Sequence, residues 1–136
     1  MLNVLSTWFW SGQNRILFEA VTNLRKESCN INVIQYCSEE LDKNEEVFSY
    51  VLKEISSVDF IIINLHGSVP YFKKFPRLRE TINSEKCPVF LISTIEEEMT
   101  EYRSWFPFSN DDYRQVYSIS PCWGVSQNMN FFASLG

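Results

Sequence analysis

The sequence predicts a single α/β domain, built as a three-layer sandwich around a mainly parallel sheet. Strand-like and helix-like segments alternate along the 136 residues, which is typical of parallel strands joined by right-handed crossovers. Hydrophobic residues make up 45% of the chain and aromatic residues 15%, so the chain can form a core of the kind that a disordered chain lacks. No low-complexity or linker-like stretch divides residues 1–136, and one domain is therefore expected.

The first strand, the first helix and the second strand are expected at the start of the chain. Residues 2–9 are apolar and rich in residues that favour strands. From residue 15 to residue 27 the apolar positions recur with the 3.6-residue period of an amphipathic helix. Residues 31–37 again have the composition of a strand.

A second helix and the most apolar strand are expected next. The helix has apolar positions from residue 47 to residue 55, and Asp42 or Asn44 is placed to cap its N-terminus. Residues 58–65 are almost continuously apolar, as expected of a strand that has helices on both faces.

A third helix is expected at residues 71–83, and a fourth strand at residues 88–93. Pro70 suits the first helical position, whereas Pro76 is expected to split or kink the helix. After the fourth strand, Thr94 is expected to cap a helix that starts with the next residue.

The pattern weakens beyond Trp105, where a short helix is expected at residues 111–117. Ser120 and Pro121 are expected to begin a last helix that continues to residue 135. The alternation predicts a mainly parallel sheet of four or more strands with a flavodoxin-like strand order.

Composition excludes several classes of protein. Twelve basic and 17 acidic residues give a net charge of −5, which argues against a nucleic-acid partner. No apolar run approaches the length of about 20 residues that a membrane span needs, and the N-terminus has no basic region of a signal peptide. The cysteines form no CxxC pair, so we expect reduced, structural thiols in a cytoplasmic protein and no metal site. They are Cys29, Cys37, Cys87 and Cys122.

Candidate functional residues lie where the strands end. Ligands of open parallel sheets bind beyond the carboxyl ends of the strands, which singles out the loops at residues 8–14, 66–71 and 93–97. His66 could bind an anionic group or exchange a proton, although a half-buried structural histidine is the more common role. The chain has neither a GxGxxG nor a GxxxxGK[ST] motif, so we expect no nucleotide cofactor in it.

Two further features allow more than one interpretation. The acidic run from Glu96 to Glu98 either complements the dipole of a helix start or is a carboxylate cluster for a hard cation. The aromatic residues exceed what a small core needs, which indicates a flat pocket or a surface that another domain covers. The aromatic residues concerned are Trp8, Phe9, Trp10, Tyr71, Phe72, Trp105, Phe106 and Phe108.

Two segments together resemble the large-subunit family of cobaltochelatase and magnesium chelatase. Residues 59–72 (DFIIINLHGSVPYF) resemble a segment near the family's amino terminus, where an apolar strand that begins with Asp leads into a Gly-rich turn and an aromatic pair. Residues 117–132 (YSISPCWGVSQNMNFF) resemble the family's following segment, with Gly-Gly, an acid and Asn before an apolar helix. Ser68 and Val125 stand where a second Gly is common, and Gln127 replaces the usual acid.

The resemblance implies an amino-terminal module of an ATP-dependent chelatase large subunit, which inserts cobalt or magnesium into a tetrapyrrole of cobalamin or chlorophyll-type biosynthesis. It implies no catalytic residue in this chain, because most of the family's large subunit lies beyond the matching segments. The implied partners are the other domains of the large subunit, the ATP-hydrolysing subunits and the tetrapyrrole; ATP and the divalent metal are used by the complete complex. The residues expected to contact the tetrapyrrole or the next domain are His66, Gly67, Ser68, Tyr71, Gly124 and Asn128.

The residues alone leave two other functions open. One is a free-standing flavodoxin-like ligand-binding or interaction domain without catalysis. The other is a small enzyme that uses His66 as an acid or a base. A module of a larger subunit is expected to expose an apolar face, whereas a free-standing domain is not.

Overall fold

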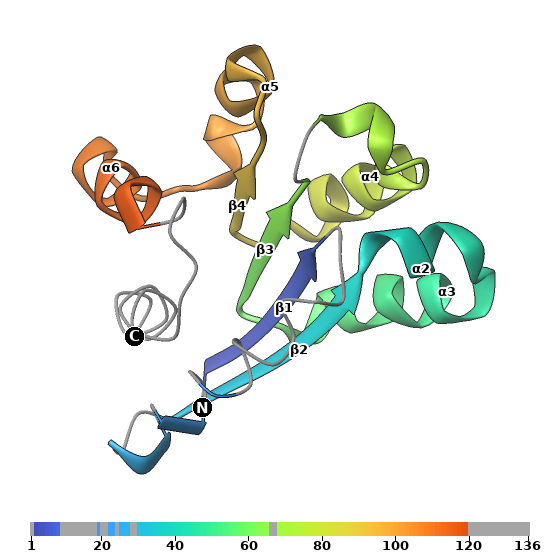
Figure 1. The fold of residues 1–136 in the computed structure, drawn as a ribbon, viewed down its shortest axis with the longest axis horizontal. Helices are drawn as coiled ribbons and strands as arrows, with labels where there is room; N and C mark the ends of the chain where they lie inside the picture. The colour runs from blue at the N-terminus through green and yellow to red at the C-terminus, as the bar shows by residue number, and fades with distance from the viewer. Residues whose placement is uncertain are drawn as a thin grey trace.

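The computed structural model describes residues 2–8, 19, 22–23, 25–27, 30–65 and 68–119, and these residues have an α/β fold (Figure 1). Its sheet has four strands, all parallel, in the order β2-β1-β3-β4. The strands are β1 (Leu2–Trp8), β2 (Ile31–Cys37), β3 (Phe60–Asn64) and β4 (Val89–Ile92). This flavodoxin-like order confirms the predicted fold class, and each strand lies within about two residues of its predicted bounds.

The central strand β3 fixes the register of the sheet. Its five residues are all buried, because β1 and β4 flank it within the sheet and helices cover both of its faces. Ile61 lies opposite Leu5 of β1 on one side and opposite Val89 of β4 on the other. Just before β3, the Asp59 carboxylate accepts a hydrogen bond of 2.9 Å from the backbone N–H of Asn3. This contact ties the start of β3 to β1.

Helices α3 (Glu45–Glu54) and α4 (Phe75–Glu85) cover one face of the sheet (Figure 1). Their buried side chains join those of β1, β3 and β4 in one hydrophobic core. The helix residues in this core include Phe48, Val51, Phe75, Leu78 and Ile82. Asn44 caps α3, since its side-chain oxygen accepts a hydrogen bond of 3.1 Å from the N–H of Val47, which confirms one of the two predicted caps.

The opposite face of the sheet is contacted by the later part of the segment that follows β4, from Phe106 onward, whereas Trp105 still packs against Phe75 of α4. A 3-10 turn, η4 (Arg103–Trp105), leads to α6 (Asn110–Ile119), which contains the predicted helix at 111–117. The Phe106 ring packs edge to face against Phe60 at 6.2 Å and against Phe90 at 5.6 Å between ring centroids. Helices therefore lie on both faces, as the three-layer prediction requires.

The helix expected at 71–83 is split at Pro76, as predicted: η3 (Val69–Tyr71) has Pro70 in its first turn and α4 has Pro76 in its first turn, because a proline is tolerated only at a helix start. Two other local predictions need correction. Thr94 is not the cap of α5 (Glu96–Glu101), whose N-cap residue is Ile95. A short helix, α2 (Ser38–Lys43), precedes α3 and is absent from the sequence-based expectations. With one buried leucine in six residues, the segment shows no helical periodicity of apolar residues.

Some predictions fall largely on residues that the structure does not describe. Residues 19, 22–23 and 25–26 are helical, as expected for the helix at 15–27, but the last helix, from residue 120, lies outside the described residues. Cys37 is buried and Cys87 half-buried, and neither is part of a disulfide bond; Cys29 and Cys122 are not described. Within the described residues, no helix is long and apolar enough to cross a membrane.

Phe106 provides a test of the packing on the α6 face. Phe106→Ala is expected to lower the free energy of unfolding by roughly 3 to 5 kcal/mol, because the ring is only 3% exposed and fills the space between two strands and α6. Urea unfolding followed by circular dichroism measures the loss. Phe108→Ala is the matched control, since that ring is 48% exposed and its removal is expected to cost about 1 kcal/mol or less. Equal losses for the two variants would contradict this packing.

Candidate functional site at the carboxyl edge of the sheet

The candidate site lies at the carboxyl ends of the strands, where the loops that follow β3 and β4 meet. Of the six predicted contact residues, the structure describes Ser68 and Tyr71. His66, Gly67, Gly124 and Asn128 lie outside the described residues. Both described residues belong to the segment between β3 and α4, so the structure tests the position of this segment directly.

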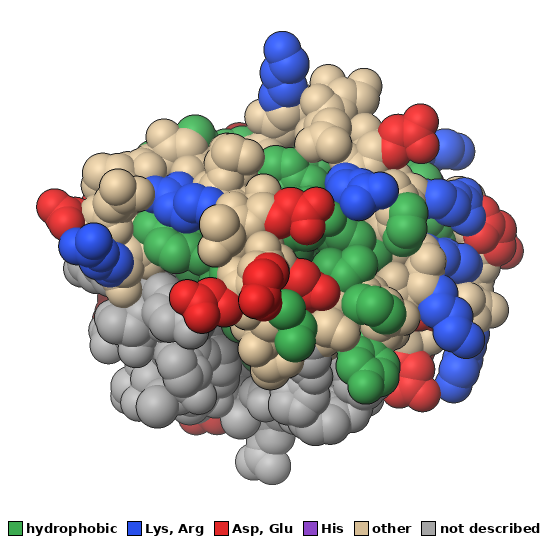
Figure 2. All heavy atoms as spheres, turned by 90° about the horizontal axis from the view of Figure 1, so that it is seen from above, with side chains coloured by type: hydrophobic (Ala, Val, Ile, Leu, Met, Phe, Trp, Pro, Cys, Tyr) green, Lys and Arg blue, Asp and Glu red, His purple; other side chains and the backbone are tan. Residues whose placement is uncertain are grey.

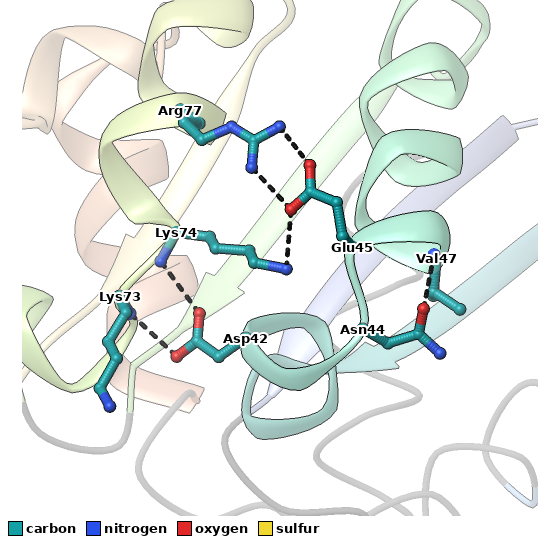
Figure 3. Close-up of polar contacts among 7 residues, drawn as sticks. All are labelled: Asp42, Asn44, Glu45, Val47, Lys73, Lys74 and Arg77. Atoms are coloured by element: carbon teal, nitrogen blue, oxygen red, sulfur yellow. Dashed lines mark hydrogen bonds and ion pairs between the residues drawn. The ribbon is translucent and has the colours of Figure 1, made fainter.

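Two carboxylates from other parts of the chain hold this segment at its two ends. At the first end, the N–H of Val69 donates to both carboxylate oxygens of Glu98 in α5, at 3.0 and 3.1 Å. At the other end, the N–H groups of Lys73 and Lys74 each donate to one oxygen of Asp42 in α2, both at 2.9 Å (Figure 3). Charged acceptors make these hydrogen bonds stronger than bonds between neutral groups. The segment from Val69 to Lys74 is thus fixed on both sides.

Glu98 also joins the loop after β3 to the loop after β4. The Ser93 hydroxyl, directly after β4, donates to a Glu98 carboxylate oxygen at 2.6 Å. The same hydroxyl oxygen accepts a hydrogen bond of 3.0 Å from the N–H of Ile95. Ser93, not Thr94, thus provides the hydroxyl that binds the backbone just before α5, and one carboxylate connects two strand ends.

Tyr71 lies between the two anchor points and faces outward. Its side chain is 67% exposed, while the next residue, Phe72, is 2% exposed and packs against Phe75 with ring centroids 6.3 Å apart. The buried neighbour and the two carboxylates fix the backbone on which the exposed ring stands. Ser68 precedes η3 as its N-cap residue, is partly exposed and makes no capping hydrogen bond with its side chain.

A charged cluster supports the second anchor point (Figure 3). The Glu45 carboxylate accepts hydrogen bonds from the Arg77 guanidinium at 2.6 and 2.8 Å and lies 3.2 Å from the Lys74 ammonium. Both cations also lie over the Phe48 ring, with 5.2 Å from the Lys74 nitrogen and 4.9 Å from the Arg77 guanidinium carbon to the ring centroid. Arg77, and then Lys74, lower the pKa of Glu45 from 4.5 to about 2. This cluster joins the start of α4 to α3.

Sequence reasoning missed the two carboxylates that organise this edge. Asp42 was considered as a helix cap, and Glu98 was considered as part of an acidic run; neither residue carries a sequence signal for its actual partner. Of the aromatic residues thought to exceed the core, several are in fact core residues: Trp8, Phe72 and Phe106 are each at most 3% exposed. Tyr71 and Phe108 are the exposed ones among those that the structure describes.

The described residues include no group of three or more His, Cys, Asp or Glu side chains that could hold a metal ion. The hard-cation interpretation of Glu96 to Glu98 therefore has no support, since the Glu98 carboxylate is occupied by backbone and serine donors. The arrangement is suited to presenting a fixed surface to a ligand or partner.

Comparison of the chain with protein-family models, with curated proteins and with solved structures finds no match. The fold and the geometry of the carboxyl edge are thus the observations on which a function is argued.

The lowered pKa of Glu45 predicts how the charged cluster responds to pH. A carboxylate whose pKa is depressed on folding stabilises the fold above its ordinary pKa, and this contribution is lost as the pH falls. The Glu45 pairs are thus expected to be intact above pH 4.5 and to be lost as the pH approaches about 2. Side-chain carboxyl ¹³C NMR measures the titration midpoint, and Arg77→Met, which removes the largest cause of the shift, is expected to return it towards 4.5. A midpoint near 4.5 in the unaltered chain would contradict the geometry of the cluster.

Proposed function

We propose that this chain is the amino-terminal module of the large subunit of an ATP-dependent chelatase, which inserts cobalt or magnesium into a tetrapyrrole. The module contributes binding surface and contacts to other domains, and the insertion step takes place elsewhere in the complex. The metal ion and the tetrapyrrole are substrates of that complex, and ATP is hydrolysed by partner subunits.

One observation carries the proposal. The segment that resembles the chelatase family, residues 59–72, consists of the buried central strand and the loop beyond its carboxyl end. That end of a parallel sheet is where ligands of such folds bind. Glu98 and Asp42 hold the loop and its continuation in place, and Tyr71 stands exposed on it. The position of the described residues of this segment, at the edge where ligands of such folds bind, supports the proposal.

A non-catalytic role agrees with the chemistry of the described residues. They offer no metal-binding group, and the sequence has no phosphate-binding glycine motif. The contact between Ser93 and Glu98 orients two loops, and both groups are engaged in backbone hydrogen bonds. These residues therefore support binding and positioning.

The second candidate is a free-standing flavodoxin-like domain that binds a ligand or a protein without catalysis. The observation that favours it is that few large apolar side chains of the described residues are exposed. Among the described residues, the exposed large hydrophobic side chains are Tyr50, Tyr71, Ile95 and Phe108. This is fewer than the extensive apolar face that the sequence analysis expected of a module taken from a larger subunit.

The size of the native protein discriminates between the two functions. An antibody raised against the 136-residue chain is used to immunoblot lysate of the source cells, with the recombinant chain of 16.0 kDa as the size control. The chelatase proposal predicts a band far above 16 kDa, because the family's large subunits are much longer than this chain. A single band at 16 kDa would contradict the proposal, and the free-standing binding domain would then be the better account.

A further inference from the structure

An exposed apolar surface lies at the carboxyl edge beside the acidic start of α5. Its apolar part is formed by Pro70 and Tyr71 of η3 and by Ile95, which precedes α5; Tyr71 is 67% and Ile95 40% exposed. Its acidic part is formed by Glu96 and Glu97, both exposed. Seen onto this edge, hydrophobic and acidic side chains lie next to one another in the middle of the face, and most lysine and arginine side chains lie towards its margin (Figure 2). We call these five residues the η3–α5 surface.

The two halves of the η3–α5 surface are joined by hydrogen bonds rather than by a flexible loop. Val69, which precedes Pro70, donates its N–H to Glu98, and Glu98 lies one helical turn after Ile95. Ser93 binds both the Glu98 carboxylate and the N–H of Ile95. The backbone that carries the exposed side chains is thus fixed, so a partner that binds them has to order the side chains but not the two loops.

The acidic half has no cationic partner within the part of the chain that the structure describes. Two other exposed glutamates of the described residues form ion pairs, Glu39 with Lys43 and Glu45 with Lys74 and Arg77, whereas Glu40, Glu46 and Glu101 are exposed and form none. No ion pair of a described residue involves Glu96 or Glu97. The helix dipole accounts for acids in the first turn of α5, but it does not account for a large apolar side chain exposed at each of two adjacent loops.

We propose that the η3–α5 surface docks a basic amphipathic segment of a protein partner. Lysine or arginine side chains of that segment lie against Glu96 and Glu97, and its apolar side chains cover Tyr71 and Ile95. An arginine is well suited to this surface because its guanidinium can pair with a carboxylate and stack on a tyrosine ring. This inference goes beyond the chelatase role, since it requires only the surface that the described residues form.

The test uses the ¹⁵N-labelled 136-residue chain and two synthetic peptides. Both peptides present leucines at helical positions i, i+3, i+4 and i+7; one carries lysine and arginine on the flanks of that stripe, and the other carries glutamate there. We expect the basic peptide to shift the amide signals of Val69, Tyr71 and residues 95–101 and the acidic peptide to leave them unchanged. The shift titration also gives the dissociation constant.

Variants then locate the contact. Tyr71→Ser combined with Ile95→Ser is expected to weaken binding of the basic peptide roughly tenfold, and Glu96→Lys combined with Glu97→Lys is expected to weaken it at least as much at low salt. Tyr50→Ser is the matched control, because Tyr50 is a tyrosine of similar exposure, 57%, on α3. It is expected to leave the dissociation constant within about twofold.

The proposal would be overturned by no binding of the basic peptide, by equal binding of both peptides, or by signal shifts that map away from Val69, Tyr71 and residues 95–101. A weakening by Tyr50→Ser equal to that by the double serine variant would do the same. All substituted side chains are exposed, so the variants are expected to fold, and the amide spectra verify this. The peptide titration does not depend on the size of the native protein. A failure of the docking proposal can therefore be distinguished from a failure of the chelatase proposal, which the immunoblot tests.

Discussion

The burial of β3 on both faces is the constraint on which the rest of the structure depends. Its five residues are inaccessible to solvent or nearly so, which requires a strand on each side and a helical layer above and below. The strands on both sides are parallel to β3, so the loops after the strands lie at one edge of the sheet. The position of the candidate site therefore depends on how the most apolar segment is packed into the sheet.

At that edge, the backbone is organised by side chains from distant parts of the chain. Glu98 and Asp42 accept hydrogen bonds from backbone N–H groups 29 to 32 residues away. They thereby satisfy donors that neither η3 nor the start of α4 satisfies internally. The cluster of Glu45 with Lys74 and Arg77 adds a second connection between α3 and α4. The loop that carries Tyr71 is consequently part of the rigid domain, and the charged surface next to it belongs to the same rigid unit.

The sequence predicted what depends on local pattern and missed what depends on distant partners. Continuous apolar runs located all four strands, and a residue of capping type before an amphipathic stretch identified Asn44. The hydroxyl that binds the backbone at the start of α5 belongs to Ser93 and not to Thr94. Residue propensities cannot distinguish two neighbouring residues of this type at a helix start. Glu98 could not be recognised as an anchor, because the N–H it binds lies in another loop that only the folded sheet brings near. The contact roles of His66, Gly67, Ser68, Tyr71, Gly124 and Asn128 stay predictions, and the chelatase role remains a proposal.

Hydrogen exchange of backbone amides tests most directly whether the two carboxylates hold the edge. The comparison is between the unaltered chain and a variant with Asp42→Asn and Glu98→Gln, with Glu97→Gln as the matched control for loss of an exposed charge on α5. The account predicts that amides 69, 73 and 74 exchange much faster in the double variant, while β3 keeps its protection and the control resembles the unaltered chain. Unchanged exchange at these three amides, or an equal loss of protection throughout β3, would contradict it.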